Sequence, residues 1–158
     1  MKKFKLILCV IFFTAAALSL AGAASAAMSD EEFLELCMNG TREEVASAIK
    51  AGANMNAADE DNWTVLHCAA LGNENPSVLE ILIENGANVN AKDNGGNTPL
   101  ILAVAGGKPK NILLLLDRGA DAGIPDNEGN TVREYLPDST DGVDENEWKA
   151  VMERLKNP

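Results

Sequence analysis

The chain has 158 residues, and its 13 Lys and Arg are outnumbered by 24 Asp and Glu, which gives a net charge of −11 at pH 7. A surface this acidic repels phosphate backbones and anionic lipids, so the composition argues against nucleic acids and membrane surfaces as partners. The length is sufficient for one domain with a buried core.

The first 26 residues are predicted to be a secretory signal peptide. Three early lysines precede an apolar run over residues 6–20, and the small residues 24–26 form a cleavage site. The alternative is a retained anchor, but the apolar run is shorter than the roughly 20 residues of a membrane helix. Position 23 is alanine rather than the cysteine that a lipid anchor requires. Cleavage after Ala26 would leave 132 residues with 10 basic and 24 acidic side chains, a net charge of −14.

The remainder of the chain repeats with a period of 33 or 34 residues. Recurring threonines and glycines mark this period: Thr64, Thr98 and Thr131, and Gly52, Gly86 and Gly119. A fixed period of this size indicates a stack of similar structural units. Residues 27–158 are therefore predicted to form one repeat domain, with units at about 29–57, 58–91, 92–124 and 125–156.

The first unit is predicted to be an atypical N-terminal cap made of two helices. Ser29 and Glu32 have the spacing of a capping box, and Asn39-Gly40 ends this helix. Thr41 begins the second helix and Gly52 ends it, because glycine adopts a left-handed backbone at little cost. The apolar positions expected to face inward are Phe33, Leu36, Cys37, Val45, Ala48 and Ile49.

The connections between units carry Asp, Asn and Gly, which are turn-forming residues. Asn62, Gly96 and Gly129 each stand two residues before a recurring threonine. Asn and Gly both tolerate positive φ, so a tight turn is predicted at this place in each unit.

The second and third units are each predicted to contain a helix that begins at the threonine and a helix that begins at a proline. Pro76 follows Asn75, a favourable helix cap, and Pro109 opens the equivalent helix of the third unit. The apolar positions expected to face inward are Leu66, Ala69, Ala70, Val78, Leu79, Leu82, Ile83, Leu100, Leu102, Ala103 and Ile112 to Leu116.

The fourth unit departs from the repeat. A first helix is expected from Thr131 through Leu136, followed by a polar loop over 137–144. Residues 144–156 then predict an amphipathic helix that would seal the end of the stack. Its apolar positions are Trp148, Val151, Met152 and Leu155.

The pattern resembles the ankyrin repeat family. The similarity lies in Asp-x-x-Asn/Gly-x-Thr-Pro/Val-Leu at the start of a unit, Ala-Ala or Ala-Val in its first helix, and Gly-Ala-Asn/Asp at its end. The resemblance implies an all-α repeat solenoid, an ankyrin-repeat stack of about four helix-turn-helix units with β-hairpin fingers and a C-terminal capping helix. It also implies a protein that binds other proteins and has no catalytic activity, so no enzyme function is expected.

In this family the contacts come from the finger tips and the adjoining first helices. Carried over by position, the expected partner contacts are Glu60, Asp61, Trp63, Lys92, Asn94, Asn97, Asn127, Glu128 and Asn130, with Met38, Leu71 and Ala105 on the helix side. Trp63 is the most informative, because later units have Asn at its place. It is interpreted either as a binding anchor or as a side chain folded back onto the first helix or the N-terminal cap.

Chemical sites are predicted to be absent. The resemblance implies that His67, the single histidine, braces Thr64 and neighbouring backbone. A metal site is not expected there, because it needs about three or four ligands. Cys37 and Cys68 are expected to be buried thiols, with a disulfide as the alternative. No base is placed to activate a serine, the acidic loop 138–145 lacks the spacing of a calcium site, and no cofactor is expected.

The resulting hypothesis is a non-enzymatic protein-binding module of the bacterial cell envelope, monomeric and either periplasmic or secreted. Its partner is a protein of unknown identity, and no contact with nucleic acid or, after signal cleavage, with the membrane is expected. The alternatives are a secreted protein that acts on a host protein and, less favoured, a periplasmic protein associated with a metal or cofactor.

Overall fold

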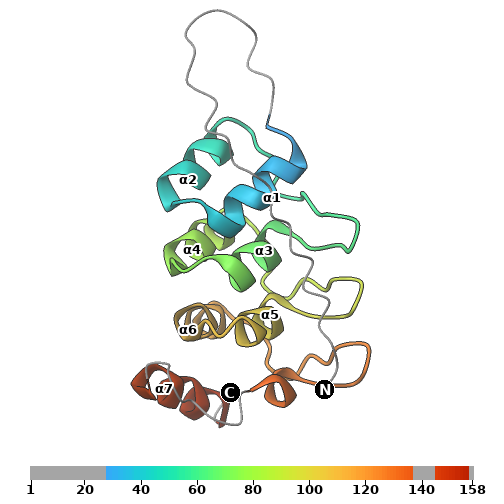
Figure 1. The fold of residues 1–158 in the computed structure, drawn as a ribbon, viewed down its shortest axis with the longest axis vertical. Coiled ribbons are helices and arrows are strands. Elements are labelled where there is room, and N and C mark those ends of the chain that lie inside the picture. The colour runs from blue at the N-terminus through green and yellow to red at the C-terminus, as the bar shows by residue number, and fades with distance from the viewer. Residues whose placement is uncertain (1–27, 137–144, 157–158) are drawn as a thin grey trace, which may run out of the picture.

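The computed structural model describes residues 28–136 and 145–156, so the expected signal peptide and the loop 137–144 lie outside the described residues. Helices make up the regular structure of this part of the chain (Figure 1). Their bounds are α1 (Asp30–Asn39), α2 (Arg42–Lys50), α3 (Val65–Gly72), α4 (Pro76–Glu84), α5 (Pro99–Ala105), α6 (Pro109–Asp117), the 3₁₀ helix η1 (Val132–Tyr135) and α7 (Glu145–Lys156). None of them is long and apolar enough to cross a bilayer.

The helices form two parallel rows. One row contains α1, α3, α5 and η1, and the other contains α2, α4, α6 and α7, with each helix packed on the next in its row (Figure 1). The paired helices α1–α2, α3–α4 and α5–α6 also pack on each other. Each unit therefore contacts only its neighbours, which is the arrangement of a solenoid. The predicted all-α repeat solenoid is confirmed.

The predicted helix boundaries follow from local capping. Ser29 Oγ accepts the Glu32 N–H at 3.2 Å, while the Glu32 carboxylate accepts the Ser29 N–H at 2.9 Å, and Thr41 and Glu44 form the same reciprocal pair. The glycines that end α2, α4 and α6 have φ of +93°, +95° and +87°. At these positions a side chain would meet steric strain, so the recurring glycine is explained by its backbone conformation.

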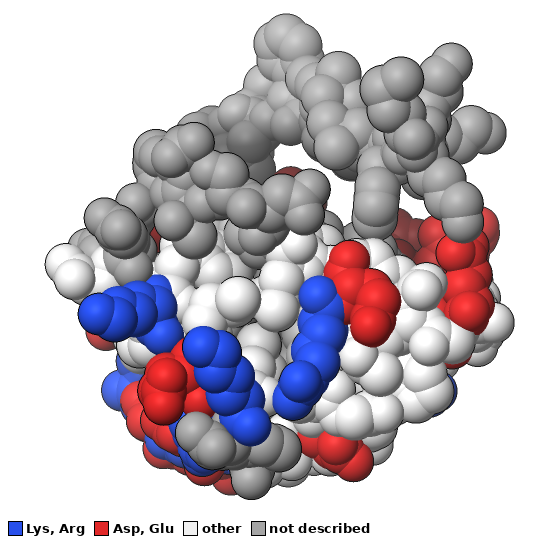
Figure 2. Space-filling model, turned by 90° about the horizontal axis from the view of Figure 1, so that it is seen from below, with Lys and Arg blue, Asp and Glu red and all other residues white. Residues whose placement is uncertain are grey.

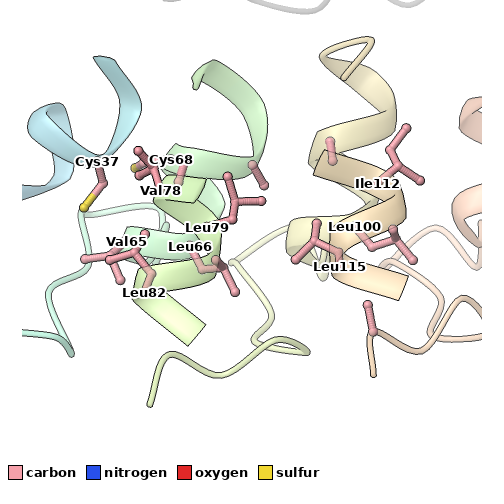
Figure 3. Packing of buried hydrophobic residues seen from close by; sticks show 14 of the residues in the cluster. Cys37, Val65, Leu66, Cys68, Val78, Leu79, Leu82, Leu100, Ile112 and Leu115 are labelled. Carbon is pink, nitrogen blue, oxygen red and sulfur yellow. The ribbon is translucent and has the colours of Figure 1, made fainter. Parts of the chain in front are cut away.

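The core runs between the two rows. Val78, Leu79 and Leu82 of α4 are fully buried, as predicted, and pack towards Leu66 of α3 (Figure 3). Small residues on the first helices allow neighbouring helices to approach closely, and they have no exposed surface: Ala69, Ala70 and Ala103. Some residues expected to face inward are only half-buried: Leu36, Ile49, Ile83, Leu113, Leu114 and Leu116.

The β-hairpin fingers are where the fold differs from expectation. The described residues contain no β-strand, and a single isolated antiparallel bridge joins Ala58 and Thr64. In each loop the first residue donates its N–H to the carbonyl of the fifth, at 2.9–3.2 Å, and the side chain of that first aspartate accepts the N–H of the fifth. The loops nevertheless project from the same side of the stack (Figure 1).

The fourth unit also corrects the sequence analysis. Its first helix is a single 3₁₀ turn, η1, rather than an α-helix. Pro137 follows in the sequence and disfavours helical backbone at the residue before it, and Leu136 has an extended conformation with ψ of 141°. The unit therefore contributes little helix to the first row.

Helix α7 lies at the end of the second row, because it packs on α6 as α6 packs on α4. Trp148, Val151 and Leu155 are buried against the stack. The prediction was wrong for Met152, whose side chain is 38% exposed. The buried stripe of α7 is narrow, and Met152 lies outside it.

Ion pairs connect successive units. Arg42 of α2 pairs with Glu84 of α4, and the others make similar steps along the stack: Lys108–Glu74, Arg118–Glu80, Lys110–Glu147 and Arg154–Asp117. At the α7 end, Lys and Arg side chains accordingly lie beside acidic ones (Figure 2). Each exposed pair contributes about 0–1 kcal/mol. These pairs involve five of the ten Lys and Arg residues beyond residue 26, so half of the basic side chains of the repeat domain bind acidic side chains of a neighbouring unit.

Candidate functional site

Three loops project side by side from the start of the first-row helices (Figure 1). They comprise residues 59–63, 93–97 and 126–130, and we call them together the loop edge. The loop edge contains six acidic residues and no Lys or Arg. Surface loops held by a rigid scaffold are where binding residues are commonly found, so the geometry of the loop edge is the starting point for function.

Each loop is closed around the side chain of its first aspartate. Oδ1 of Asp59, Asp93 and Asp126 accepts the N–H of the residue four positions later at 2.8 Å. The tight turn predicted from the sequence is present, because Asn62, Gly96 and Gly129 have φ of 62°, 80° and 88°. The sequence indicates that these aspartates are turn residues, but it does not show that they organise the loops.

Asparagines join each loop to the next. Asn94 donates its backbone N–H to Asp61 O and its side-chain N–H to Glu60 O, each at 2.9 Å. Asn127 makes the same two bonds to the second loop, also at 2.9 Å. The amides of these two predicted contact residues therefore tie the loops together, and the loop edge is a connected surface rather than three separate tips.

Two further predicted contact residues turn back into their own loops. The side-chain amide of Asn97 donates to both oxygens of Asp93, and that of Asn130 donates to Asp126 Oδ2 at 3.2 Å. Both asparagines are half-buried. The side chains of Asn97 and Asn130 therefore stabilise the shape of their loops. A partner would contact the exposed residues around them.

Hydrogen bonds stabilise the carboxylate of Asp126. Burial alone would raise its pKa, but hydrogen bonds from Tyr135, Asn130 and the Glu128 N–H lower the pKa of Asp126 to about 2. The same bond and burial raise the pKa of the Tyr135 phenol to about 12. The third loop is thus anchored to η1 through a carboxylate that stays ionised at neutral pH.

The remaining predicted contact residues differ in how they are exposed. Glu60, Asp61 and Glu128 are exposed at the loop tips, whereas Trp63 is half-buried and packs partly against the core. Lys92 is exposed along its stem, and its Nζ donates to Pro125 O at 2.8 Å. The first loop therefore presents the most acidic tip, with an indole beside it.

The helix side of the predicted surface is partly used within the stack. A Cβ on Gly72 would lie 2.3 Å from Met38 Cγ, and one on Gly106 would lie 2.7 Å from Leu71 O. Met38 and Leu71 thus pack where neighbouring first-row helices end, and both are half-buried. Ala105 is exposed and remains accessible beside them.

His67 has the bracing role that the sequence predicted. Its Nδ1 lies 3.1 Å from Thr64 N and 2.9 Å from Thr64 Oγ1, and its Nε2 lies 3.1 Å from Asn97 O. Because Thr64 N–H can only donate, Nδ1 is the acceptor and Nε2 carries the proton. The imidazole therefore links the first loop to the second from a fully buried position.

We expect His67 to make stability depend on pH. Burial lowers its pKa below the usual 6.5, although the Asn97 carbonyl opposes this shift. The unfolded chain therefore takes up the proton first, and the free energy of unfolding should fall as the pH drops below about 6.5. Urea unfolding at about pH 7.5 and 5.5 measures the drop. A His67→Gln control should show a smaller one, and an equal drop in both proteins would contradict this role.

The cysteines are free thiols. Cys37 and Cys68 are both buried and unbridged, in agreement with the favoured prediction. Burial raises the pKa of each thiol to about 12, with the neighbouring Cys68 adding to the effect on Cys37. Both are therefore protonated at neutral pH and serve as small core residues. In the part of the chain that the structure describes, His, Cys, Asp and Glu form no cluster suited to a metal.

Comparison with known proteins identifies the repeat. Residues 33–126, more than half of the chain, match the family described as ankyrin repeats in three copies. The chain belongs to the ankyrin repeat family. Proteins of this family are in general non-catalytic modules for protein–protein interaction, so a protein partner is the expected ligand class.

Curated relatives share the repeat region. The chain is 34% identical over 119 residues, 74% of its length, to the E3 ubiquitin-protein ligase KEG of Arabidopsis thaliana. It is 34% identical over 115 residues, 70% of its length, to ankyrin repeat and SOCS box protein 6 of Mus musculus. A Fowlpox virus ankyrin repeat protein, FPV219, is 45% identical over 64 residues, 40% of this chain. The aligned regions cover only 7%, 27% and 14% of these relatives.

Proposed function

We propose that this ankyrin repeat protein is a non-enzymatic binding module that docks a protein partner on its loop edge. The observation that carries the proposal is Trp63, a half-exposed indole at a place where the other two loops have an asparagine turned inward. The fold does not need an aromatic residue there, and partly exposed tryptophans are common anchors of protein interfaces.

The connected loops favour such a role. Because Asn94 and Asn127 fix each loop to the next, the loop edge is already arranged before a partner arrives. A preformed surface loses less conformational entropy on binding than separate flexible loops would. The predicted contacts Glu60, Asp61, Glu128 and Lys92 surround the tips, and Leu71 and Ala105 extend the surface along the first-row helices.

The stack is proposed to consist of about four units, with α7 as the second helix of the last unit and as the C-terminal cap. Its buried face meets α6, and its outer face carries Lys149, Glu153 and Lys156, all exposed. A polar outer face on a terminal helix keeps the end of a solenoid soluble. We further propose that the protein acts as a monomer.

Location is proposed from the N-terminal sequence. The basic start, apolar run and small-residue cleavage site support export to a bacterial periplasm or release into the medium. Release would favour action on a host protein, and retention would favour a partner of the cell envelope. Fractionation of cells into periplasm and medium separates these two alternatives, and recovery only from the cytoplasm would contradict both.

Site-specific photocrosslinking in cells tests the binding surface. A photoreactive residue at Glu60 places the probe on the most acidic loop tip, where the side chain is exposed and its replacement leaves the loop bonds intact. We expect this position to yield a specific covalent adduct with a protein partner.

A further inference from the structure

One carboxylate distinguishes the first loop from its two neighbours. Asp93 and Asp126 are only 8% and 7% exposed, and in each of them both oxygens accept hydrogen bonds. Asp59 is exposed. Its Oδ1 accepts the N–H groups of Asp61 and Trp63 at 3.0 and 2.8 Å. Among the described residues, none donates a hydrogen bond to Asp59 Oδ2.

The tryptophan causes this difference. In the second and third loops the Oδ2 atom accepts an N–H of the Asn97 or Asn130 amide, at 2.9 and 3.2 Å. Trp63 stands at the equivalent place and makes no such bond within the described residues. The first loop therefore keeps its shape through Oδ1, and Oδ2 has no donor among the described residues, while the half-buried Trp63 stands in the same loop.

We propose that a guanidinium group of the partner occupies the place of the missing amide. The guanidinium donates to Asp59 Oδ2, as the Asn97 or Asn130 amide N–H does in the second and third loops. It also lies against the exposed part of the Trp63 ring. This inference rests on the proposed function and specifies its chemistry: the partner presents an arginine. Arginine fits better than lysine because its planar fork can donate to a carboxylate while stacking on an aromatic face.

The surrounding charge favours the same ligand. Glu60 and Asp61 are exposed beside Asp59, and the loop edge carries no basic residue. Lys92, whose carbonyl accepts the side-chain N–H of Asn62, donates its Nζ to Pro125 O. A cationic segment is therefore drawn towards the first loop at long range, and the geometry at Asp59 and Trp63 gives it a specific place.

Calorimetric titration of the full chain with an oligo-arginine peptide tests the assignment, with an oligo-citrulline peptide as the uncharged control of the same shape. Asp59→Asn keeps the Oδ1 acceptor and replaces the open oxygen with a donor. Trp63→Asn introduces the residue that the second and third loops have at this place, and its amide N–H would then occupy Asp59 Oδ2. Each should weaken oligo-arginine binding by about tenfold or more. Glu43→Gln on α2 removes the same charge away from the loop edge and should change binding less than about twofold.

The outcomes are distinct. Equal weakening by Asp59→Asn and Glu43→Gln would overturn the proposal, because net charge alone would then explain binding. Equal affinity for the citrulline peptide would overturn it as well.

The partner adduct formed from Glu60 should also decrease in Asp59→Asn. If that adduct persists unchanged, the cation assignment is wrong while the binding surface stands. If no adduct forms with either protein, the proposed function itself fails. Unchanged melting of both loop variants confirms that the fold is retained.

Discussion

Leu82→Ala is expected to lower the free energy of unfolding by about 2–5 kcal/mol. Leu82 is fully buried on α4, between the two rows of helices. The change removes apolar contacts and leaves a cavity that neighbouring helices cannot fill without shifting. In a solenoid the loss affects both adjoining interfaces, because each unit is stabilised mainly by its neighbours.

Urea unfolding followed by circular dichroism measures this loss. Ile83→Ala is the matched control, because it removes a similar side chain one residue later on the same helix, where the side chain is half-buried. We expect a clearly smaller effect at Ile83. Equal effects at the two positions would mean that the orientation of α4 is wrong.

Trp148→Ala is expected to cost about 3–5 kcal/mol and to release α7 from the stack. Trp148 is 2% exposed and is the largest fully buried side chain of the described residues. Polar contacts at this junction include Lys110–Glu147 at 3.2 Å, Arg154–Asp117 at 3.6 Å and Arg133 to Leu155 O at 2.6 Å. Ion pairs at the surface do not replace the lost apolar area.

Hydrogen exchange measures where the stability is lost. Amides of α7 should lose protection first and those of α6 next, while α1 to α4 stay protected because α7 packs mainly on α6. Met152→Ala on the same helix is the control, and it should change stability by no more than about 0.5 kcal/mol. Loss of protection throughout the stack, or none in α7, would contradict the placement of α7 as the last second-row helix.

The parts of the fold that could be predicted are those whose residues recur in every unit. The threonine, the glycine and the turn position recur in the sequence, so helix starts, helix ends and positive φ followed from spacing. The bracing role of His67 followed instead from the resemblance to the ankyrin repeat family, because the later units have Ile101 and Glu134 at its place. Repetition makes such inferences strong, since a feature seen three times is constrained by the backbone rather than by chance.

Features that belong to one unit could not be predicted in this way. Asn73 donates to Cys37 O and Gly40 O, and Asn111 donates to Asn73 O at 2.8 Å. The acceptors Gly40 and Asn73 are 33 residues apart, yet the donors stand at different places, one in a turn and one in a helix. Their equivalent roles are visible only in three dimensions.

The candidate site was predictable in position but not in role. Sequence spacing placed Asn94, Asn97, Asn127 and Asn130 on the loop edge, but it could not show that their amides are used inside the stack. The open oxygen of Asp59 has no sequence signal of its own. It follows from comparing three loops whose shape is the same and whose side-chain bonds differ.

The central claim, that the loop edge is the binding surface, is tested most directly by comparing two photocrosslinking positions in the same cells. Glu60 lies on the loop edge, and Glu43 lies in the first turn of α2, in the other row of helices. The structure predicts a specific protein adduct from position 60 and none from position 43. A partner that crosslinks from position 43 and not from position 60 would contradict the claim.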